Sequence, residues 1–252
     1  MALSDFKLAF FREDGTAITT FYGGRDGHIA GLALNEREEI VIAGRKDGYY
    51  GLHLLSGIPE RNTFHLQTLR VGAGASGHIF DMIPSGEGSY YLCGIVTYYD
   101  DVPVHSVFRL LPGGELDGQF EARMENAGSI RSICLDEEGR LLVGGSFTLA
   151  REEDRCNIAR ISPDDGSPLP GFAELGLPFK NHVTQLGIDP QGAILASCWN
   201  LHRQHPEHLP IWRILPNGAI DESLRARLQN YEFNGQALGF CQLENGRIFV
   251  YG

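Results

Sequence analysis

The feature that most constrains this chain is a 17-residue segment that occurs five times in the sequence. Its copies span 28–44, 78–94, 129–145, 182–198 and 236–252 and align without gaps. Every copy has apolar residues at its second and fifth positions, then a turn, then a short apolar run. Two apolar runs around a turn predict a β-hairpin. A period of roughly 50 residues indicates a solenoid or a propeller, in which each unit buries its apolar faces against its neighbours.

A second segment of the form apolar–turn–apolar follows these hairpins. It is clear at 107–120, 158–172 and 211–224, and a similar segment stands at 6–21, before the first hairpin. The first full unit is the most degenerate, with 50–55 as its expected third strand. We therefore expect units of four antiparallel strands, A to D in chain order.

The order of the two kinds of hairpin predicts a closed ring. The sequence begins with a C–D hairpin and stops after an A–B hairpin, so the two halves together make a fifth unit. Pairing them would cover strand edges that are otherwise exposed. We predict an all-β fold, a five-bladed β-propeller of four-stranded blades in a single domain over 1–252. The expected blades are 28–72, 78–124, 129–177, 182–228, and 236–252 joined with 5–22. An open solenoid, the alternative, would leave two half units unpaired.

The third unit carries the repeat most clearly, with GRLLVGGSFT at 139–148 and NIARISPDDGS at 157–167. These segments resemble the delta-60 repeat family of bacterial β-propellers, whose pattern is a DGKILVGGxFT hairpin followed by an IARLNxDGSLDxSF hairpin. The resemblance covers nearly the whole chain and is weakest in the first and the split fifth units. It implies a propeller of bacterial type, and it transfers no catalytic residue.

Composition limits the classes of partner and the compartment. The formal net charge of −11 argues against nucleic acid, because binding to a polyanion relies on Lys and Arg. The sequence has no apolar run of membrane-spanning length and no signal-peptide pattern at its N-terminus. We expect a soluble cytoplasmic protein, with non-classical export as the alternative. The five cysteines, without a CxxC motif, predict buried free thiols.

Loop length indicates which end of the blades binds a ligand. The A–B and C–D turns are short, whereas the B–C segments at 95–106, 146–157 and 199–210 are longer. Function concentrates on variable loops held by a rigid scaffold. We therefore expect the ligand-binding face at the end of the blades where the long loops open.

The first position of each A strand is expected to face the same end. It holds polar residues in all five copies, namely His28, His78, Ser129, His182 and Gln236, and Asp81 lies one layer deeper. Fivefold symmetry would gather these side chains at the mouth of the central channel. His28, His78 and His182 together could bind a divalent metal or an anion. The alternative is that polar side chains simply line a channel filled with water.

The long loops add aromatic and acidic candidates. Tyr98, Tyr99, Asp101 and His105 in one loop, with Trp199 in another, could form a platform for a sugar or a peptide. The alternative is that Tyr98 and Trp199 pack between blades, which we favour for Trp199 because it directly follows a strand.

Arginine and aspartate recur in step with the second hairpin. Arg109, Arg160 and Arg213 recur in the expected strand C of three successive units, and Asp117 and Asp221 follow eight residues after the first and last of them. Recurrence with the repeat is typical of a structural role. We therefore predict Arg–Asp ion pairs within the blades.

Two functions remain open. The preferred one is a non-enzymatic binding module that takes a glycan, peptide or protein ligand on the long-loop face and requires no cofactor. The alternative is a metal-assisted hydrolase or lyase centred on the three histidines with a divalent metal. Glycosidase chemistry needs two carboxylates, and the expected inner strands offer only Asp81, so we lean against an enzyme.

Removal of residues 1–21 tests ring closure. It should strip two strands from the fifth blade and expose the edge of the last hairpin. We expect aggregation or loss of cooperative unfolding, measured by light scattering and thermal denaturation. A truncated chain that stays monomeric with an unchanged melting temperature would contradict the closed ring.

Overall fold

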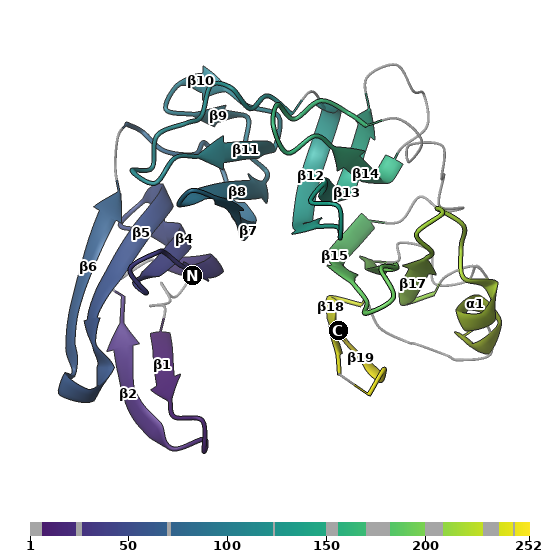
Figure 1. The fold of residues 1–252 in the computed structure, drawn as a ribbon. Helices are drawn as coiled ribbons and strands as arrows, with labels where there is room; N and C mark the ends of the chain where they lie inside the picture. Colours follow the sequence, from purple (N-terminus) through teal and green to yellow (C-terminus); the bar gives the residue numbers. More distant parts are fainter. Residues whose placement is uncertain are drawn as a thin grey trace. The chain divides into compact units, whose positions relative to one another are not determined.

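All five repeated segments contain antiparallel β-hairpins in the computed structural model of the chain (Figure 1). The structure describes residues 7–23, 27–69, 72–122, 124–149, 156–169, 182–199, 209–228, 237–243 and 245–252. Within these ranges the secondary structure is almost entirely strand, with one α-helix and one short 3-10 helix. The chain divides into two compact units, each larger than one repeat, which we call the first unit (Met1–Gly118) and the second unit (Gln119–Gly252). The single closed domain and the fivefold ring concern the relation between these units and stay predictions.

The first unit contains three sheets and one short ladder. Strands β1 (Lys7–Phe11) and β2 (Ala17–Tyr22) pair alone. A four-stranded sheet follows, made of β3 (His28–Leu34), β4 (Ile40–Lys46), β5 (Tyr49–Ile58) and β6 (Thr63–Leu69), with the 3-10 helix η1 (Pro59–Arg61) between the last two. The third sheet has β7 (Ile79–Gly86), β8 (Ser89–Gly94) and β11 (Val107–Leu110). The ladder joins β9 (Tyr98–Tyr99) and β10 (Val102–Pro103) inside the long loop between β8 and β11.

The second unit has two three-stranded sheets and a terminal hairpin. The first sheet contains β12 (Met124–Leu135), β13 (Leu141–Leu149) and β14 (Cys156–Ile161). The second contains β15 (His182–Ile188), β16 (Ile194–Trp199) and β17 (Ile211–Ile214), and α1 (Glu222–Leu228) follows it. The hairpin pairs β18 (Gly239–Gln242) with β19 (Ile248–Tyr251).

The repeated hairpins share one irregularity of register. In β3, β7, β12 and β15 a β-bulge falls at the third position of the repeat. The second and fourth positions, on either side of it, pair with two adjacent residues of the partner strand. In the third copy, for example, Ile130 pairs with Gly145 and Ser132 pairs with Gly144. A bulge increases the local twist and turns a side chain out of the regular alternation. Its recurrence shows that the repeat encodes the distortion as well as the strands.

In the first three copies the glycine after the second apolar run leaves no room for a Cβ atom. A Cβ atom on Gly145 would overlap the carbonyl oxygen of Ser129, and Gly44 and Gly94 meet the first-position carbonyl of their own hairpins in the same way. The fourth copy has Cys198 at this position, in the same pairing with its second-position residue, Val183.

The expected fourth strand is confirmed only in the first full repeat. The first full repeat matches the repeat pattern least well in sequence, yet it has the complete four-stranded sheet β3–β6. In the second and fourth repeats the described part of strand D forms only the isolated bridges Leu110–Leu116 and Ile214–Ile220. In the third repeat the bridge Ile161–Pro168 is present, and residues 170–177 lie outside the described residues. In the fourth repeat α1 follows the bridge directly. Four-stranded blades throughout are therefore wrong for the described residues.

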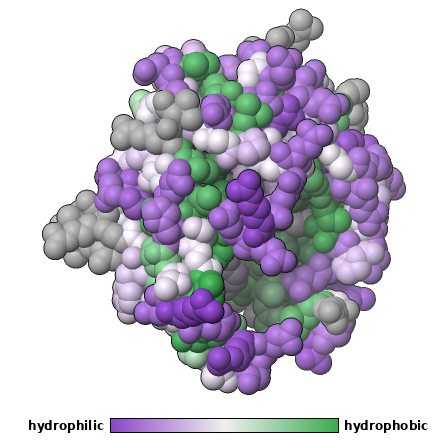
Figure 2. All heavy atoms as spheres, turned by 60° about the vertical axis from the view of Figure 1, so that its left-hand side comes forward, coloured by the Kyte–Doolittle hydropathy of each residue, from purple (hydrophilic) through white to green (hydrophobic). Residues whose placement is uncertain are grey.

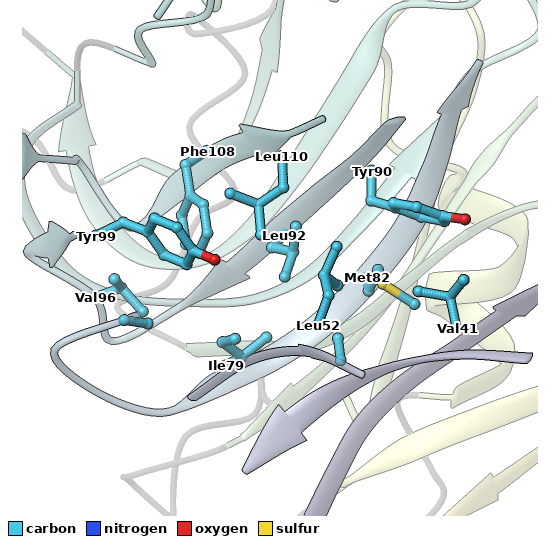
Figure 3. Packing of buried hydrophobic residues seen from close by; sticks show 12 residues of the cluster. Val41, Leu52, Ile79, Met82, Tyr90, Leu92, Val96, Tyr99, Phe108 and Leu110 are labelled. Atoms are coloured by element: carbon cyan, nitrogen blue, oxygen red, sulfur yellow. The ribbon is translucent and has the colours of Figure 1, made fainter. Parts of the chain in front are cut away.

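Apolar side chains pack adjacent sheets together within each unit. In the first unit Val41 and Leu52 of the β3–β6 sheet pack with Met82, Leu92 and other buried residues of the β7–β8–β11 sheet (Figure 3). In the second unit Leu142 lies in one cluster with Val183, Ile194 and Trp212. This face-to-face packing of successive sheets is the arrangement expected of neighbouring blades.

The two terminal hairpins each pack on the sheet next to them. Phe10 of β1 stacks on Phe64 of β6 with ring centroids 5.1 Å apart, and Phe240 of β18 joins the cluster of Leu195 and Ile211. Removal of residues 1–21 would therefore also uncover this apolar face, a cost that does not depend on ring closure.

The predicted Arg–Asp pairs are confirmed. Arg109 Nε lies 2.6 Å from Asp117 Oδ2, and Arg213 Nη1 lies 2.8 Å from Asp221 Oδ2. In the third and fourth repeats an aspartate of the A–B turn also forms an ion pair with the strand C arginine. Asp136 binds Arg160 in the third repeat, and Asp189 binds Arg213 in the fourth. Although burial acts to raise the pKa of Asp189, the hydrogen bond from Arg213 and the turn amides lower it overall. The pairs of Asp136 and Asp189 therefore tie the A–B turns of the third and fourth repeats to the hairpins that follow them.

The cysteines partly follow the prediction. Cys93 and Cys198 are buried free thiols, Cys134 is half-buried and free, and Cys241 is exposed and free, which corrects the expectation for that residue. Burial raises the pKa of Cys198 to about 12, so this thiol stays protonated. The surroundings of Cys156 lie outside the described side chains.

A buried histidine lies inside the first four-stranded sheet. His53 of β5 is fully inaccessible to solvent, and its Nδ1 lies 3.2 Å from Thr68 Oγ1. Its ring meets that of Tyr49 almost perpendicularly at a centroid distance of 6.1 Å. Burial lowers the pKa of His53 to about 4, so the imidazole is neutral in the folded protein at neutral pH.

Substitution of the recurrent glycine tests the hairpin geometry. Gly145→Ala places a Cβ against the carbonyl oxygen of Ser129 and should destabilise the fold by about 2 kcal/mol. We expect a fall of several degrees in melting temperature. The control is Gly118→Ala, because a Cβ there meets no atom within 4 Å. Equal melting temperatures for the two variants would contradict the proposed role of the glycine.

Acid should destabilise the protein through His53. The unfolded chain binds a proton at this residue near its ordinary pKa of 6.5, whereas the folded chain binds it only near 4. Stability should therefore be lost as the pH falls from 6.5 to about 4, by about 3 kcal/mol from this group. Urea unfolding at several pH values measures the effect, and His53→Leu should remove most of it. The exposed His65→Leu variant should retain it, and a retained acid limb in His53→Leu would show that another group is responsible.

Candidate functional site

The three histidines at the first repeat position lie where the A strands begin, whereas Ser129 lies inside β12, which begins at Met124. His28 opens β3 and His78 directly precedes β7, and both are exposed. In the second unit His182 opens β15 and is half-buried, whereas Ser129 in β12 is only 9% exposed. Gln236 lies outside the described residues. The bulge that follows two positions later is common to these four strands.

In the first unit two of the predicted histidines come together. The rings of His28 and His78 are perpendicular, with centroids 6.5 Å apart. Tyr50 of β5 lies edge-on to His78 at 5.1 Å, with its hydroxyl 3.3 Å from Nδ1. The guanidinium carbon of Arg45, the residue paired with His28 across the β3–β4 ladder, lies 5.5 Å from the centroid of the Tyr50 ring. We call these four residues the His–Tyr–Arg cluster.

The charge of this cluster comes from Arg45. Partial burial and the neighbouring His78 lower the pKa of His28, which favours its neutral form. Arg45 is half-buried, and within the described part of the chain no carboxylate forms an ion pair with it. Its Nε is buried without a hydrogen-bond acceptor among the described residues. The cluster therefore combines one permanent positive charge with two exposed imidazoles and a phenol.

A related group occurs in the second unit. The ring of His182 lies 6.2 Å from that of Trp199, with which it pairs across the β15–β16 ladder. The guanidinium carbon of Arg131 lies 5.9 Å from the Trp199 centroid. Trp199 is half-buried, with its indole nitrogen inaccessible to solvent. A histidine, an aromatic ring and an arginine thus meet at the start of an inner strand in both units, although the contributing repeat positions differ.

Residues one layer deeper connect successive inner strands. The side chain of Ser132 accepts a hydrogen bond from Leu186 N at 3.1 Å, and that of Gln185 accepts one from Phe240 N at 2.8 Å. Asp81, the carboxylate predicted as a site residue, accepts from Met82 N at 2.9 Å and is half-buried. These contacts give the fourth repeat position a structural role within each unit.

The predicted loop platform is only partly present. Tyr98 is 51% exposed, and Asp101 and His105 are exposed in the same loop. Tyr99, however, is completely buried, and its hydroxyl donates a hydrogen bond to the carbonyl oxygen of Gly114 at 2.8 Å. Its assignment as a ligand-binding residue is therefore wrong, because the short β9–β10 ladder turns this side chain into the core.

Arg45, Tyr50 and Arg131 were not identified from the sequence as members of these groups. Each occupies its repeat position in one copy alone, so the pattern of the repeat does not single it out. Across the ranges that the structure describes, no group of three or more His, Cys, Asp or Glu residues is placed to hold a metal ion. No helix in those ranges is long and apolar enough to cross a membrane.

Residues 139–172 match a family model described as a domain of unknown function (DUF5122) beta-propeller. A comparison with curated protein sequences gives no significant match. The structure resembles a gluconolactonase from Xanthomonas campestris with a TM-score of 0.52 and 14% identity, over 97% of this chain and 75% of that one. It also resembles PorZ, a surface component of the type-IX secretion system of Porphyromonas gingivalis, with a TM-score of 0.51 and 13% identity, over 94% of this chain and 34% of that one. The chain therefore carries a β-propeller repeat, and the likeness to the solved structures concerns the fold.

Proposed function

We propose that this chain, which carries a β-propeller repeat, is a non-enzymatic binding module. Its ligand is a glycan, peptide or protein, and it binds at the end of the blades where the inner strands begin and the long loops open. The observation that carries this proposal is the His–Tyr–Arg cluster, which exposes two imidazoles beside an arginine without a carboxylate partner among the described residues.

The chemistry of the cluster favours a ligand with an anionic group. A guanidinium binds carboxylates and phosphates through paired hydrogen bonds, and imidazole and phenol groups add further donors. The protein as a whole is acidic, with a formal net charge of −11, which disfavours general adsorption of polyanions. Binding of an anionic ligand should therefore be confined to the local cationic group. Exposed Tyr98 in the neighbouring loop offers an aromatic face for the ring of a sugar or for an apolar side chain. An acidic glycan or an acidic peptide fits both features.

The alternative is a metal-assisted hydrolase or lyase in which His28, His78 and His182 bind a divalent metal. It requires the three imidazoles to converge across the two units, and neutral imidazoles are good ligands for transition metals. Metal analysis of the purified protein distinguishes the two functions. Stoichiometric zinc, manganese or iron that is lost from the variant with all three histidines replaced by serine would favour the enzyme.

Binding to polyanions with and without the cluster tests the proposal. Polygalacturonate and poly-L-glutamate should bind in isothermal titration calorimetry, whereas neutral dextran should not. Arg45→Gln should weaken binding by about tenfold or more, because it removes the fixed charge. The triple His28→Ser, His78→Ser, His182→Ser variant should weaken it less and should leave the melting temperature nearly unchanged.

The control is Arg12→Gln, which removes an equal charge from the exposed turn between β1 and β2. Arg12→Gln should bind like the unmodified protein. If both arginine variants lost affinity equally, the loss would come from the change in net charge, which would contradict a binding site at the cluster.

A further inference from the structure

A cavity of about 380 Å³ lies in the first unit at the opposite end of the strands from the His–Tyr–Arg cluster. The turn between β3 and β4, the turn between β7 and β8, and the turn after β11 surround its opening. We infer that this cavity binds a small organic cation with an apolar body, at a site separate from the proposed binding face. The inference depends on neither the cluster nor ring closure.

The inner wall of the cavity is apolar. Val41, Leu54 and Leu69 contribute to it from three adjacent strands of the β3–β6 sheet, and Tyr90 contributes from β8. These residues belong to the border of the first unit's core, so the wall is held by packed sheets rather than by loops alone. Such a wall stabilises an apolar group by removing it from water.

The opening is acidic. Glu36, Glu39 and Glu87 line it, against one cation, Arg37. Glu39 is fixed by a hydrogen bond from Asn35 Nδ2 at 3.0 Å, and the other two glutamates are exposed at the rim. None of the three carboxylates forms an ion pair with a residue that the structure describes. The opening therefore keeps a net negative charge that favours a cation and disfavours an anion.

Tyr90 supplies an unused polar group inside the cavity. The residue is 2% exposed, and within the described chain its hydroxyl has no hydrogen-bond partner. In Figure 3 the hydroxyl points away from the other side chains of the cluster, past Met82 and Val41. Burial and the nearby Glu36 raise the pKa of Tyr90, so the hydroxyl keeps its proton and can donate it. A ligand oxygen in the cavity could accept a hydrogen bond from this hydroxyl.

These three features together specify the ligand. Its ammonium group would lie near Glu36 and Glu87, its apolar body would cover the aliphatic wall, and an oxygen at its far end would accept a hydrogen bond from Tyr90. Tyramine has this order of groups. Its analogue tyrosol has a hydroxyl in place of the ammonium, and phenylethylamine lacks the phenolic oxygen.

Titration calorimetry with these three compounds tests the inference at neutral pH. Tyramine should bind with one site per chain, tyrosol at least about tenfold more weakly, and phenylethylamine about threefold more weakly. Saturable binding of tyramine that is matched by tyrosol would overturn the role of the carboxylates. Absence of saturable tyramine binding at about 10 mM would overturn the site itself.

Three variants assign the effects to residues. Glu36→Gln combined with Glu87→Gln should weaken tyramine by about tenfold or more and leave tyrosol unchanged. Tyr90→Phe should weaken tyramine to the level of phenylethylamine and leave phenylethylamine unchanged. Glu13→Gln removes an exposed carboxylate that does not line the cavity, and it should bind like the unmodified protein. A tyramine affinity lowered as much by Glu13→Gln as by the double variant would show a general charge effect and would refute the inference.

Discussion

The constraint on which the fold depends is the need to satisfy buried backbone amides next to the recurrent bulge. The bulge interrupts the pairing of four inner strands at the third repeat position, two residues before the fifth. The amide of Leu186 then donates to the side chain of Ser132, one repeat earlier, and that of Phe240 donates to the side chain of Gln185. A buried amide without an acceptor costs about 1–3 kcal/mol, so these contacts hold successive inner strands in register.

The same need explains the exception in the first unit. Gly31 occupies the fourth position of the first copy and has no side chain to offer to Met82. The amide of Met82 donates instead to Asp81, its own neighbour in sequence. A Cβ on Gly31 would lie only 3.0 Å from the Met82 nitrogen, so the two inner strands approach closely here. The lack of a side chain at Gly31 thus coincides with a different acceptor for the Met82 amide.

Much of the local structure could be predicted from the sequence because the repeat reports it directly. The hairpins follow from the spacing of apolar residues, and the ion pairs of Arg109 and Arg213 follow from their recurrence. The lack of a full D strand in the described parts of the second and fourth repeats could not be read in this way, because a single bridge satisfies the hairpin turn without extending it. In the fourth unit the sequence contained a stronger local signal: Asp221 accepts from the amides of Ser223 and Leu224, which makes it the N-cap of α1. The aspartate therefore serves both the predicted ion pair and a helix that the repeat pattern does not contain.

The candidate site was predictable only where its residues belong to the repeat. The histidines at the first repeat position recur in step with the repeat, and the rings of His28 and His78 meet in the first unit. Arg45 and Tyr50 join them through cross-strand pairing, which links residues without a common repeat position. Tyr99 was misassigned because neighbouring tyrosines in a loop differ completely in burial once the loop forms its own ladder.

The hydrogen bonds between inner strands have a direction: the side chain of the earlier repeat accepts, and the amide of the later repeat donates. An interface of this kind is heterologous, since its two surfaces differ and each unit carries one of either sort. Such an array can end only by joining its last surface to its first or by capping both. In the closed ring that the sequence predicts, a variant that opened the array would present complementary surfaces to a second copy, and we would expect head-to-tail polymerisation through the same kind of bond.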